Sequence, residues 1–168
     1  MEIKGAKTVM AIWYSRRKRD DIIGKVKNYK SRICAHSGMQ EKGINYWETY
    51  ASVVQWTSVG ILLILAAIEN LHTKSIDFVL AYPQADLDVD IYMELPKGFN
   101  MGPESERDVL KLQKNRYSLK QAGHNWFEKL SSALGNLSSN PSKVDPCVFI
   151  KLAHKINRFC TCISTSQP

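Results

Sequence analysis

Residues 75–87 read SIDFVLAYPQADL, and this stretch decides the fold that the sequence predicts. Its β-branched and aromatic residues indicate a strand over Ile76–Tyr82, which ends before Pro83 because proline cannot donate to a β-ladder. Asp77 lies inside the apolar run, where a charged group is costly unless it is paired, solvated or bound to a cation. Two interpretations of Asp77 therefore stay open, a carboxylate on the solvent face of the strand or a metal ligand.

Two helices are predicted, one on either side of this stretch. The first begins at Thr57 or Ser58, which can cap it, and runs to about residue 70. Its apolar side chains cover most of one face, so we expect this helix to be well buried. The second helix follows the capping-box pattern formed by Ser118 and Gln121 and ends near residue 135.

Short runs rich in β-branched and aromatic residues predict the remaining strands. They are residues 8–14, 29–35, 91–95, 109–112 and 147–152. The charged segment between the first two favours a turn over residues 16–25, so these two strands form a hairpin. The order hairpin, helix, hairpin, helix, strand indicates an α+β fold rather than regular βαβ alternation.

The length and composition favour one domain with its own core. The chain has 168 residues, of which 44% are hydrophobic and 23% are charged. We expect the domain to occupy residues 1–152. Residues 153–168 lose hydrophobic periodicity and are predicted to form an irregular tail.

The positive charge of the chain is concentrated near its beginning. The net charge is +7, and residues 1–32 alone hold ten Lys or Arg against three acidic residues. The densest run is Arg16, Arg17, Lys18 and Arg19. A local basic patch is what a phosphate-binding surface needs. The alternative is a solvated, weakly ordered arm without a partner.

Several classes of site are not indicated by the sequence. The four cysteines contain no C-x-x-C pair and the four histidines are scattered, so we expect no zinc site. We also expect no disulfide framework, because no signal-peptide pattern is present. The longest central apolar stretch, about ten residues, is too short to cross a bilayer. These features predict a cytoplasmic or nuclear protein without a membrane partner.

Six segments together resemble the copia-type retrotransposon reverse transcriptases. They are residues 28–38 (NYKSRICAHSG), 46–54 (YWETYASVV), 75–87 (SIDFVLAYPQADL), 91–99 (IYMELPKGF), 117–122 (YSLKQA) and 145–149 (DPCVF). They occur in the family's order, at plausible spacings, over roughly residues 8–152. The resemblance implies the fingers and the first part of the palm of a right-hand polymerase. The family's activity is RNA-directed DNA synthesis by two-metal phosphoryl transfer.

The resemblance implies a metal ligand and a sugar contact in the 75–87 segment. Asp77, with the backbone carbonyl of Phe78, would bind Mg²⁺, because hard oxygen ligands suit this ion. Tyr82 matches the bulky residue that excludes a 2′-hydroxyl beneath the incoming sugar, although a strand tyrosine is more commonly a core aromatic.

The resemblance also implies nucleotide-binding and template-binding residues elsewhere. Arg32 and Lys30 would clamp the triphosphate, or else lie on a solvated strand edge. Gln121 would lie near the nucleotide sugar, or else serve only as the capping partner of Ser118. The run of four cations would face template phosphate, a sequence-independent contact. The residues concerned are Arg16, Arg17, Lys18 and Arg19.

The expected partners are an RNA template, an RNA–DNA hybrid and deoxynucleoside triphosphates, and the sequence leaves the oligomeric state undetermined. The family's Tyr-x-Asp-Asp element is absent after Phe149, and no acidic residue follows Asp145. We therefore expect a truncated reverse transcriptase that is inactive alone. Two alternatives stay open, a non-catalytic nucleic-acid-binding remnant and a relic that does not fold stably. Departures from the family pattern point the same way: Ser31, Ser52, Gly60 and Ser118 replace Ala, Pro, Arg and Gly.

Overall fold

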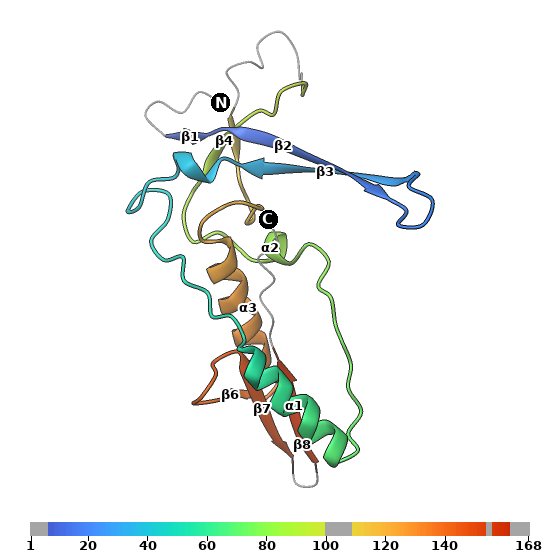
Figure 1. Cartoon of the computed structure of the whole chain (residues 1–168). Helices are drawn as coiled ribbons and strands as arrows, with labels where there is room; N and C mark the ends of the chain where they lie inside the picture. The colour runs from blue at the N-terminus through green and yellow to red at the C-terminus, as the bar shows by residue number, and fades with distance from the viewer. Residues whose placement is uncertain (1–6, 100–108, 154–155, 162–168) are drawn as a thin grey trace. The chain divides into compact units, whose positions relative to one another are not determined.

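A computed structural model of the chain describes residues 7–99, 109–153 and 156–161. The chain divides into two compact units, each built from two separate segments (Figure 1). The first unit comprises Met1–Glu48 and Tyr82–Ala122, and the second comprises Thr49–Ala81 and Gly123–Pro168. Small sheets and a few helices make up both units, which agrees with the predicted mixture of α and β structure.

The first unit contains a small mixed sheet. Strands β1 (Thr8–Val9), β4 (Tyr92–Glu94) and β5 (Val109–Lys111) pair in the order β1-β4-β5. The β1–β4 pair is parallel and the β4–β5 pair is antiparallel. The predicted strands at 91–95 and 109–112 are confirmed with slightly shorter bounds.

The longest strands of the first unit form an antiparallel hairpin, β2 (Ala11–Arg19) with β3 (Val26–Ala35). Figure 1 shows it projecting as a long ribbon. The Asp20 carboxylate accepts hydrogen bonds from the backbone N–H groups of Ile22 (2.9 Å) and Ile23 (3.1 Å), which closes the turn. The hairpin is confirmed, but the single strand predicted over residues 8–14 is wrong, because residues 8–9 form β1 and pair with β4. The turn is also shorter than predicted, because residues 16–19 extend β2.

The core of the first unit joins this hairpin to the small sheet. Its buried side chains are Val9, Ala35, Ile91, Met93, Leu112, Leu119 and Ala122. Tyr82 packs against this cluster from the four-residue helix α2 (Ala81–Gln84). A single turn of 3-10 helix, η1 (Ser37–Met39), follows β3. The first unit therefore closes a core with residues that lie more than eighty positions apart.

The second unit holds the two long helices and an antiparallel sheet. The helices are α1 (Trp56–Ile68) and α3 (Ala122–Asn136), which begins at the last residue of the first unit. Strands β6 (Asn140–Pro141), β7 (Val148–Ala153) and β8 (Ile156–Thr161) pair in the order β6-β7-β8. The predicted irregular tail is wrong over residues 156–161, because this segment pairs with β7 along its whole length.

Helix α1 forms close to its predicted bounds, but the predicted cap is wrong, because Thr57 and Ser58 lie inside the helix and Gln55 is its N-cap. The expectation that α1 is well buried is also wrong. No residue of α1 is buried, and Ile64 and Ile68 are 60% and 72% exposed. Residues 61–68 are apolar without interruption, so a pattern of this kind predicts burial on every side. Burial needs a neighbouring element, and among the residues that the structure describes none covers the apolar side chains of α1.

The strand predicted over Ile76–Tyr82 does not form. Residues 71–78 have no regular secondary structure, and Tyr82 and Pro83 lie in helix α2. Leu80 has a φ of 53°, which a β-strand does not allow. The β-branched residues favour a strand only where a neighbouring strand pairs with them, and no described strand lies against this segment.

The capping box predicted at Ser118 and Gln121 does not form either. Ser118 has a φ of 72°, whereas an N-cap residue has an extended backbone, and α3 begins only at Ala122. The side chain of Gln121 points to other partners, described below. The left-handed backbone at Ser118 explains why the resembling family has glycine there, because glycine adopts this conformation at little cost.

Candidate functional site

The register of the β2–β3 hairpin divides its cations between two faces. Side chains alternate along a strand, and cross-strand partners point to the same side. Arg16 pairs with Lys30, and Tyr14 pairs with Arg32, so these four share one face with Lys18. We call Arg16, Lys18, Lys30 and Arg32 the cationic face. Because of the alternation, Arg17 projects on the opposite side, so Arg16 and Arg17 of the run expected to face template phosphate lie on different faces of the hairpin.

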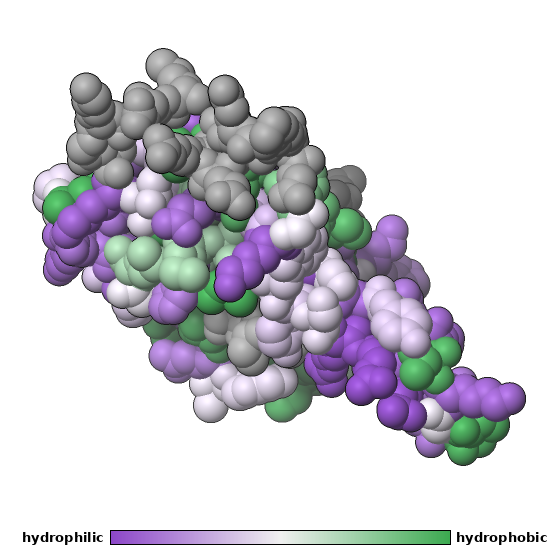
Figure 2. Space-filling view, turned by 90° about the horizontal axis from the view of Figure 1, so that it is seen from above, coloured by the Kyte–Doolittle hydropathy of each residue, from purple (hydrophilic) through white to green (hydrophobic). Residues whose placement is uncertain are grey.

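The cationic face is exposed and electrostatically unbalanced. All four side chains are exposed, and within residues 7–99, 109–153 and 156–161 none of them belongs to an ion pair. Arg16 and Lys30 lie directly opposite each other, an arrangement that destabilises a sheet by like-charge repulsion. Figure 2 shows mainly hydrophilic side chains along the projecting arm. A bound polyanion would remove this repulsion, so the arrangement favours phosphate binding.

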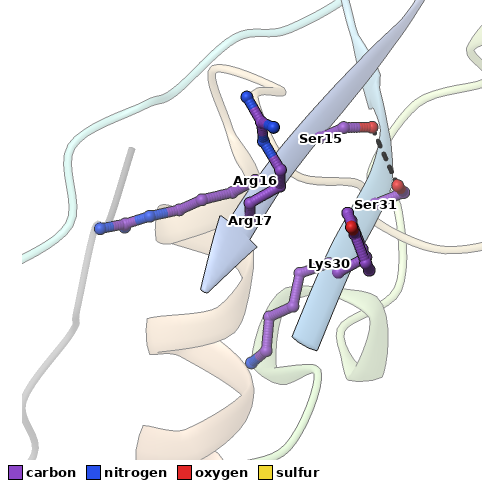
Figure 3. Close-up of a pocket in the computed structure, with 6 residues that line it drawn as sticks. Ser15, Arg16, Arg17, Lys30 and Ser31 are labelled. Atoms are coloured by element: carbon purple, nitrogen blue, oxygen red, sulfur yellow. Dashed lines mark hydrogen bonds between the residues drawn. The ribbon is translucent and has the colours of Figure 1, made fainter. Parts of the chain in front are cut away.

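A shallow pocket of about 300 Å³ lies on the same hairpin. Its lining residues are Ser15, Arg16, Arg17, Tyr29, Lys30 and Ser31. The hydroxyls of Ser15 and Ser31 are 2.9 Å apart and form a hydrogen bond across the strands, while Arg16, Arg17 and Lys30 extend away from the ribbon (Figure 3). Ser31 therefore makes a cross-strand contact that the family's alanine cannot make.

Arg32 and Tyr82 are brought together through a third residue, Tyr117. The guanidinium carbon of Arg32 lies 5.1 Å from the centre of the Tyr117 ring. The ring of Tyr82 lies 5.5 Å from that of Tyr117, tilted by 59°. We call these three residues the tyrosine–arginine cluster, and all three belong to the first unit. Sequence reasoning missed Tyr117, although it begins the recognised segment 117–122.

Gln121 is fully buried and bonded at both ends of its amide. Its Oε1 accepts a hydrogen bond from Gln40 Nε2 (2.9 Å), and its Nε2 donates to the backbone oxygen of Asn45 (2.9 Å). Gln40 Oε1 in turn accepts from the backbone N–H of Lys120 (2.9 Å). The network ties the loop after η1 to the segment before α3. The sequence offered no signal for it, because Gln40 and Gln121 are 81 positions apart.

Asp77 belongs to the second unit, in the irregular segment before α2. Its side chain is exposed, and the ring of its neighbour Phe78 packs edge-on against Trp126 at 5.1 Å. Across the described parts of the chain, no group of three or more His, Cys, Asp or Glu could hold a metal ion. The described residues therefore do not assemble a two-metal site, and we derive no chemical step through one.

The segment of residues 145–147 (DPC) has a clear structural role in the second unit. The buried carboxylate of Asp145 accepts hydrogen bonds from the backbone N–H groups of Gln55 and Cys147, both at 3.0 Å. Gln55 is the N-cap of α1, so Asp145 caps this helix from a distant part of the chain. A hydrogen bond from Ser58, opposed by desolvation and helped by these backbone bonds, holds the pKa of Asp145 below its usual value.

Cys147, next to this cap, is not a reactive thiol. It is completely buried, and burial together with the charge of Asp145 raises its pKa to about 11. The thiolate is the nucleophilic form and the metal-binding form, so at neutral pH this side chain behaves as a small apolar group.

Comparison with known proteins identifies the family. Residues 2–161 match the family described as reverse transcriptase (RNA-dependent DNA polymerase). The match covers nearly the whole chain, so the chain belongs to the reverse transcriptase family. Members of this family generally use divalent metal ions, a nucleic-acid template and nucleotide substrates.

The relatives are of the copia type. The chain is 34% identical over 148 residues to the retrovirus-related Pol polyprotein from transposon TNT 1-94 of Nicotiana tabacum, covering 88% of this chain and 11% of that protein. It is 32% identical over 127 residues to the corresponding polyprotein from transposon RE1 of Arabidopsis thaliana, covering 76% of this chain and 9% of that protein. It is 29% identical over 138 residues to the Transposon Ty1-BL Gag-Pol polyprotein of Saccharomyces cerevisiae, covering 79% and 7%.

The chain thus spans about a tenth of the length of these polyproteins. No solved structure matches it. In the described residues, no helix is both long enough and apolar enough to cross a membrane.

Proposed function

We propose that this chain is the fingers and the first part of the palm of a copia-type reverse transcriptase, and that it grips nucleic acid and an incoming nucleotide. The observation that carries the proposal is the cationic face of the β2–β3 hairpin, whose Arg32 lies against Tyr117 and, through it, Tyr82. The first unit therefore holds both cations, which can bind the phosphates of a nucleotide, and aromatic rings, which can contact its sugar or base.

Each part of the first unit has a proposed role. Arg32 and Lys30 neutralise the charge of the triphosphate, and the planar guanidinium can form two parallel hydrogen bonds to phosphate oxygens. Tyr82 lies beneath the sugar and excludes a 2′-hydroxyl by its bulk. Arg16 and Lys18 extend the same face toward the template backbone. Arg17, beside the 71%-exposed Tyr29 on the other face, can contact a second phosphate while the ring stacks on a base.

Gln121 and Asp77 have more limited proposed roles. The amide of Gln121 is already bonded, so it contributes to nucleotide binding by holding the surrounding loops, and its contact with the sugar would use only its remaining N–H and lone pair. Asp77, with the carbonyl of Phe78, would supply one side of a Mg²⁺ site. One carboxylate supplies too few ligands to hold two metal ions well, so we propose that this chain alone does not polymerise DNA.

Nucleic-acid binding is tested by fluorescence anisotropy with a labelled RNA–DNA hybrid at 50 and 200 mM salt. Binding should weaken steeply with salt, because cations on the protein displace counterions from phosphate. The variant Arg16→Glu/Lys30→Glu should bind more weakly and with a shallower salt dependence. The control Lys74→Glu/Lys143→Glu makes the same charge change at exposed positions in the second unit and should bind nearly normally. Equal losses in both variants would show that only net charge matters and would refute the proposed face.

The absence of polymerase activity is tested separately by primer extension with Mg²⁺. We expect no synthesis above a protein-free control. Clear Mg²⁺-dependent extension by the purified 168-residue chain would overturn this part of the proposal. Hybrid binding without binding of deoxynucleoside triphosphates would instead favour the second candidate, a non-catalytic nucleic-acid-binding module, which the exposed cationic face also supports.

A further inference from the structure

Tyr117 joins two residues that the proposed function assigns to different parts of the nucleotide. Arg32 comes from strand β3 and Tyr82 from helix α2, fifty residues apart in sequence. The Tyr117 ring contacts both, at 5.1 Å from the guanidinium carbon and 5.5 Å from the second ring. A cation within about 6 Å of a ring centre is attracted by the ring's electrons, and a tilted pair of rings at this distance is also favourable.

The backbone around Tyr117 is anchored at two points. The carbonyl oxygen of Tyr117 accepts a hydrogen bond from the N–H of Ala35, the buried last residue of β3, at 3.3 Å. Two residues later, Leu119 enters the core of the first unit. The left-handed turn at Ser118 connects these two anchors. The backbone that carries the Tyr117 ring is therefore fixed relative to both β3 and the core.

Arg32, by contrast, is exposed on a projecting strand and carries a long side chain. A free arginine of this kind loses conformational entropy when it binds a phosphate, and a contact that orders it beforehand reduces that loss. Tyr82 is already half-buried against the core. The Tyr117 ring attracts both side chains and therefore favours an arrangement in which the guanidinium and the Tyr82 ring lie on the same aromatic neighbour.

We propose that Tyr117 is a positioning residue, which holds Arg32 for the triphosphate and Tyr82 for the sugar as a single binding unit. This inference rests on the proposed nucleotide-binding function. It assigns to Tyr117 no contact with the nucleotide itself. Loss of the ring should therefore weaken phosphate binding through Arg32 and, through Tyr82, reduce discrimination between deoxyribose and ribose.

The test measures binding of inorganic tripolyphosphate, dATP and ATP by calorimetry to the full chain and its variants. Tyr117→Leu should weaken tripolyphosphate binding about two- to tenfold, the range of an exposed cation–π contact plus the ordering of one side chain. Tyr117→Phe keeps the ring and should bind as the parent does. The double variant Arg32→Ala/Tyr117→Leu should lose no more tripolyphosphate affinity than Arg32→Ala alone, because both changes remove the same phosphate contact of Arg32. The ratio of dATP to ATP affinity should fall for Tyr117→Leu and for the double variant, but not for Tyr117→Phe or Arg32→Ala.

Tyr46→Leu is the matched control, because Tyr46 makes the same kind of contact with Lys120 (4.7 Å) elsewhere in the first unit. It should leave all three affinities unchanged, and circular dichroism should show that both leucine variants are folded. Equal losses in Tyr46→Leu and Tyr117→Leu would refute the inference, and so would normal binding by Tyr117→Leu when Arg32→Ala is impaired. In the latter case the proposed function would stand. If the parent chain binds neither tripolyphosphate nor dATP, the proposed function fails and the inference fails with it.

Discussion

The two units of this chain treat their apolar residues in opposite ways. The first unit encloses a core in which Ile91 and Val9 are at most 1% exposed. The second unit carries α1, the most apolar helix of the chain, with no buried residue in it. Composition does not explain the contrast, because α1 contains a larger number of large apolar residues than any strand of the first unit. What differs is whether a partner from another part of the described chain lies against the apolar surface.

The first unit is closed by long-range contacts around its small sheet, whereas the buried apolar residues described in the second unit are Trp126, Cys147, Val148 and Phe149. In the second unit, α1 is fixed at its start by Asp145 and α3 is buried mainly at Trp126, which is 6% exposed. Large exposed apolar surfaces commonly mark sites covered by another protein surface. Among the described residues, both units therefore have buried apolar side chains, but no residue of α1 belongs to them.

The largest expected effect is a matched pair of substitutions, one in each unit. Ile91→Ala should lower the free energy of unfolding by about 2–5 kcal/mol, because it empties a fully buried position in the first unit. Ile64→Ala, on exposed α1, should change it by less than about 0.5 kcal/mol. Urea unfolding followed by circular dichroism measures both. If Ile64→Ala is as damaging as Ile91→Ala, then α1 is covered in solution and the contrast between the units breaks down.

A smaller effect is expected at the cap that holds α1. Asp145→Asn should destabilise the chain by about 1–3 kcal/mol, the usual worth of hydrogen bonds to a charged group. Because the pKa of Asp145 is lowered in the folded chain, its contribution is complete above the ordinary aspartate pKa of 3.8 and is lost as the pH falls toward the lowered value.

The pH dependence sharpens this prediction. Between pH 5 and pH 2 the parent chain should lose more stability than Asp145→Asn, so their stability curves converge in acid. Asp20→Asn is the control. Backbone hydrogen bonds also lower the pKa of Asp20, but Asp20 lies in an exposed turn of the first unit, so this variant changes a similar carboxylate that does not cap α1. Parallel curves for the parent and Asp145→Asn would show that the carboxylate charge at position 145 does not support α1.

The smallest expected effect is a gain. Ser118→Gly should stabilise the first unit by up to about 1 kcal/mol, because a residue with a side chain is strained in the left-handed conformation and glycine is not. Glycine also adds entropy to the unfolded chain, which offsets part of this gain. The comparison is Ser52→Gly, which changes a residue without a positive φ and should not stabilise. A lower midpoint of thermal unfolding for Ser118→Gly would contradict the strain at this position.

A single cooperative thermal transition would also exclude the possibility that the chain is a relic that does not fold stably. Two transitions would indicate that the units unfold separately. In that case, hydrogen exchange should locate the later transition in the unit that contains Ile91.

Much of the local structure follows from the sequence. Both long helices and three shorter strands form close to their predicted bounds, because their periodicity and β-branched content agree with the final environment. The hairpin also forms, but its first strand is Ala11–Arg19 and not residues 8–14. The failures have tertiary causes. Residues 76–82 have strand propensity but no described pairing partner, and residues 156–161 lack a clear pattern but pair with β7. Gln121 has the spacing of a capping residue, yet Gln40 and Asn45 bind its amide instead.

In the candidate site, too, the sequence predicted the local features and the tertiary structure decided the contacts. The sequence alone determined the family, the basic character of residues 16–32 and the identities of Arg32, Tyr82 and Asp77 as candidate site residues, because motifs and charge are local properties that survive without coordinates. Only the tertiary structure decided which cations share a face, that Tyr117 joins Arg32 to Tyr82, and that α1 stays exposed. Those outcomes depend on strand register and on contacts between residues distant in sequence, and a linear pattern carries no information about either.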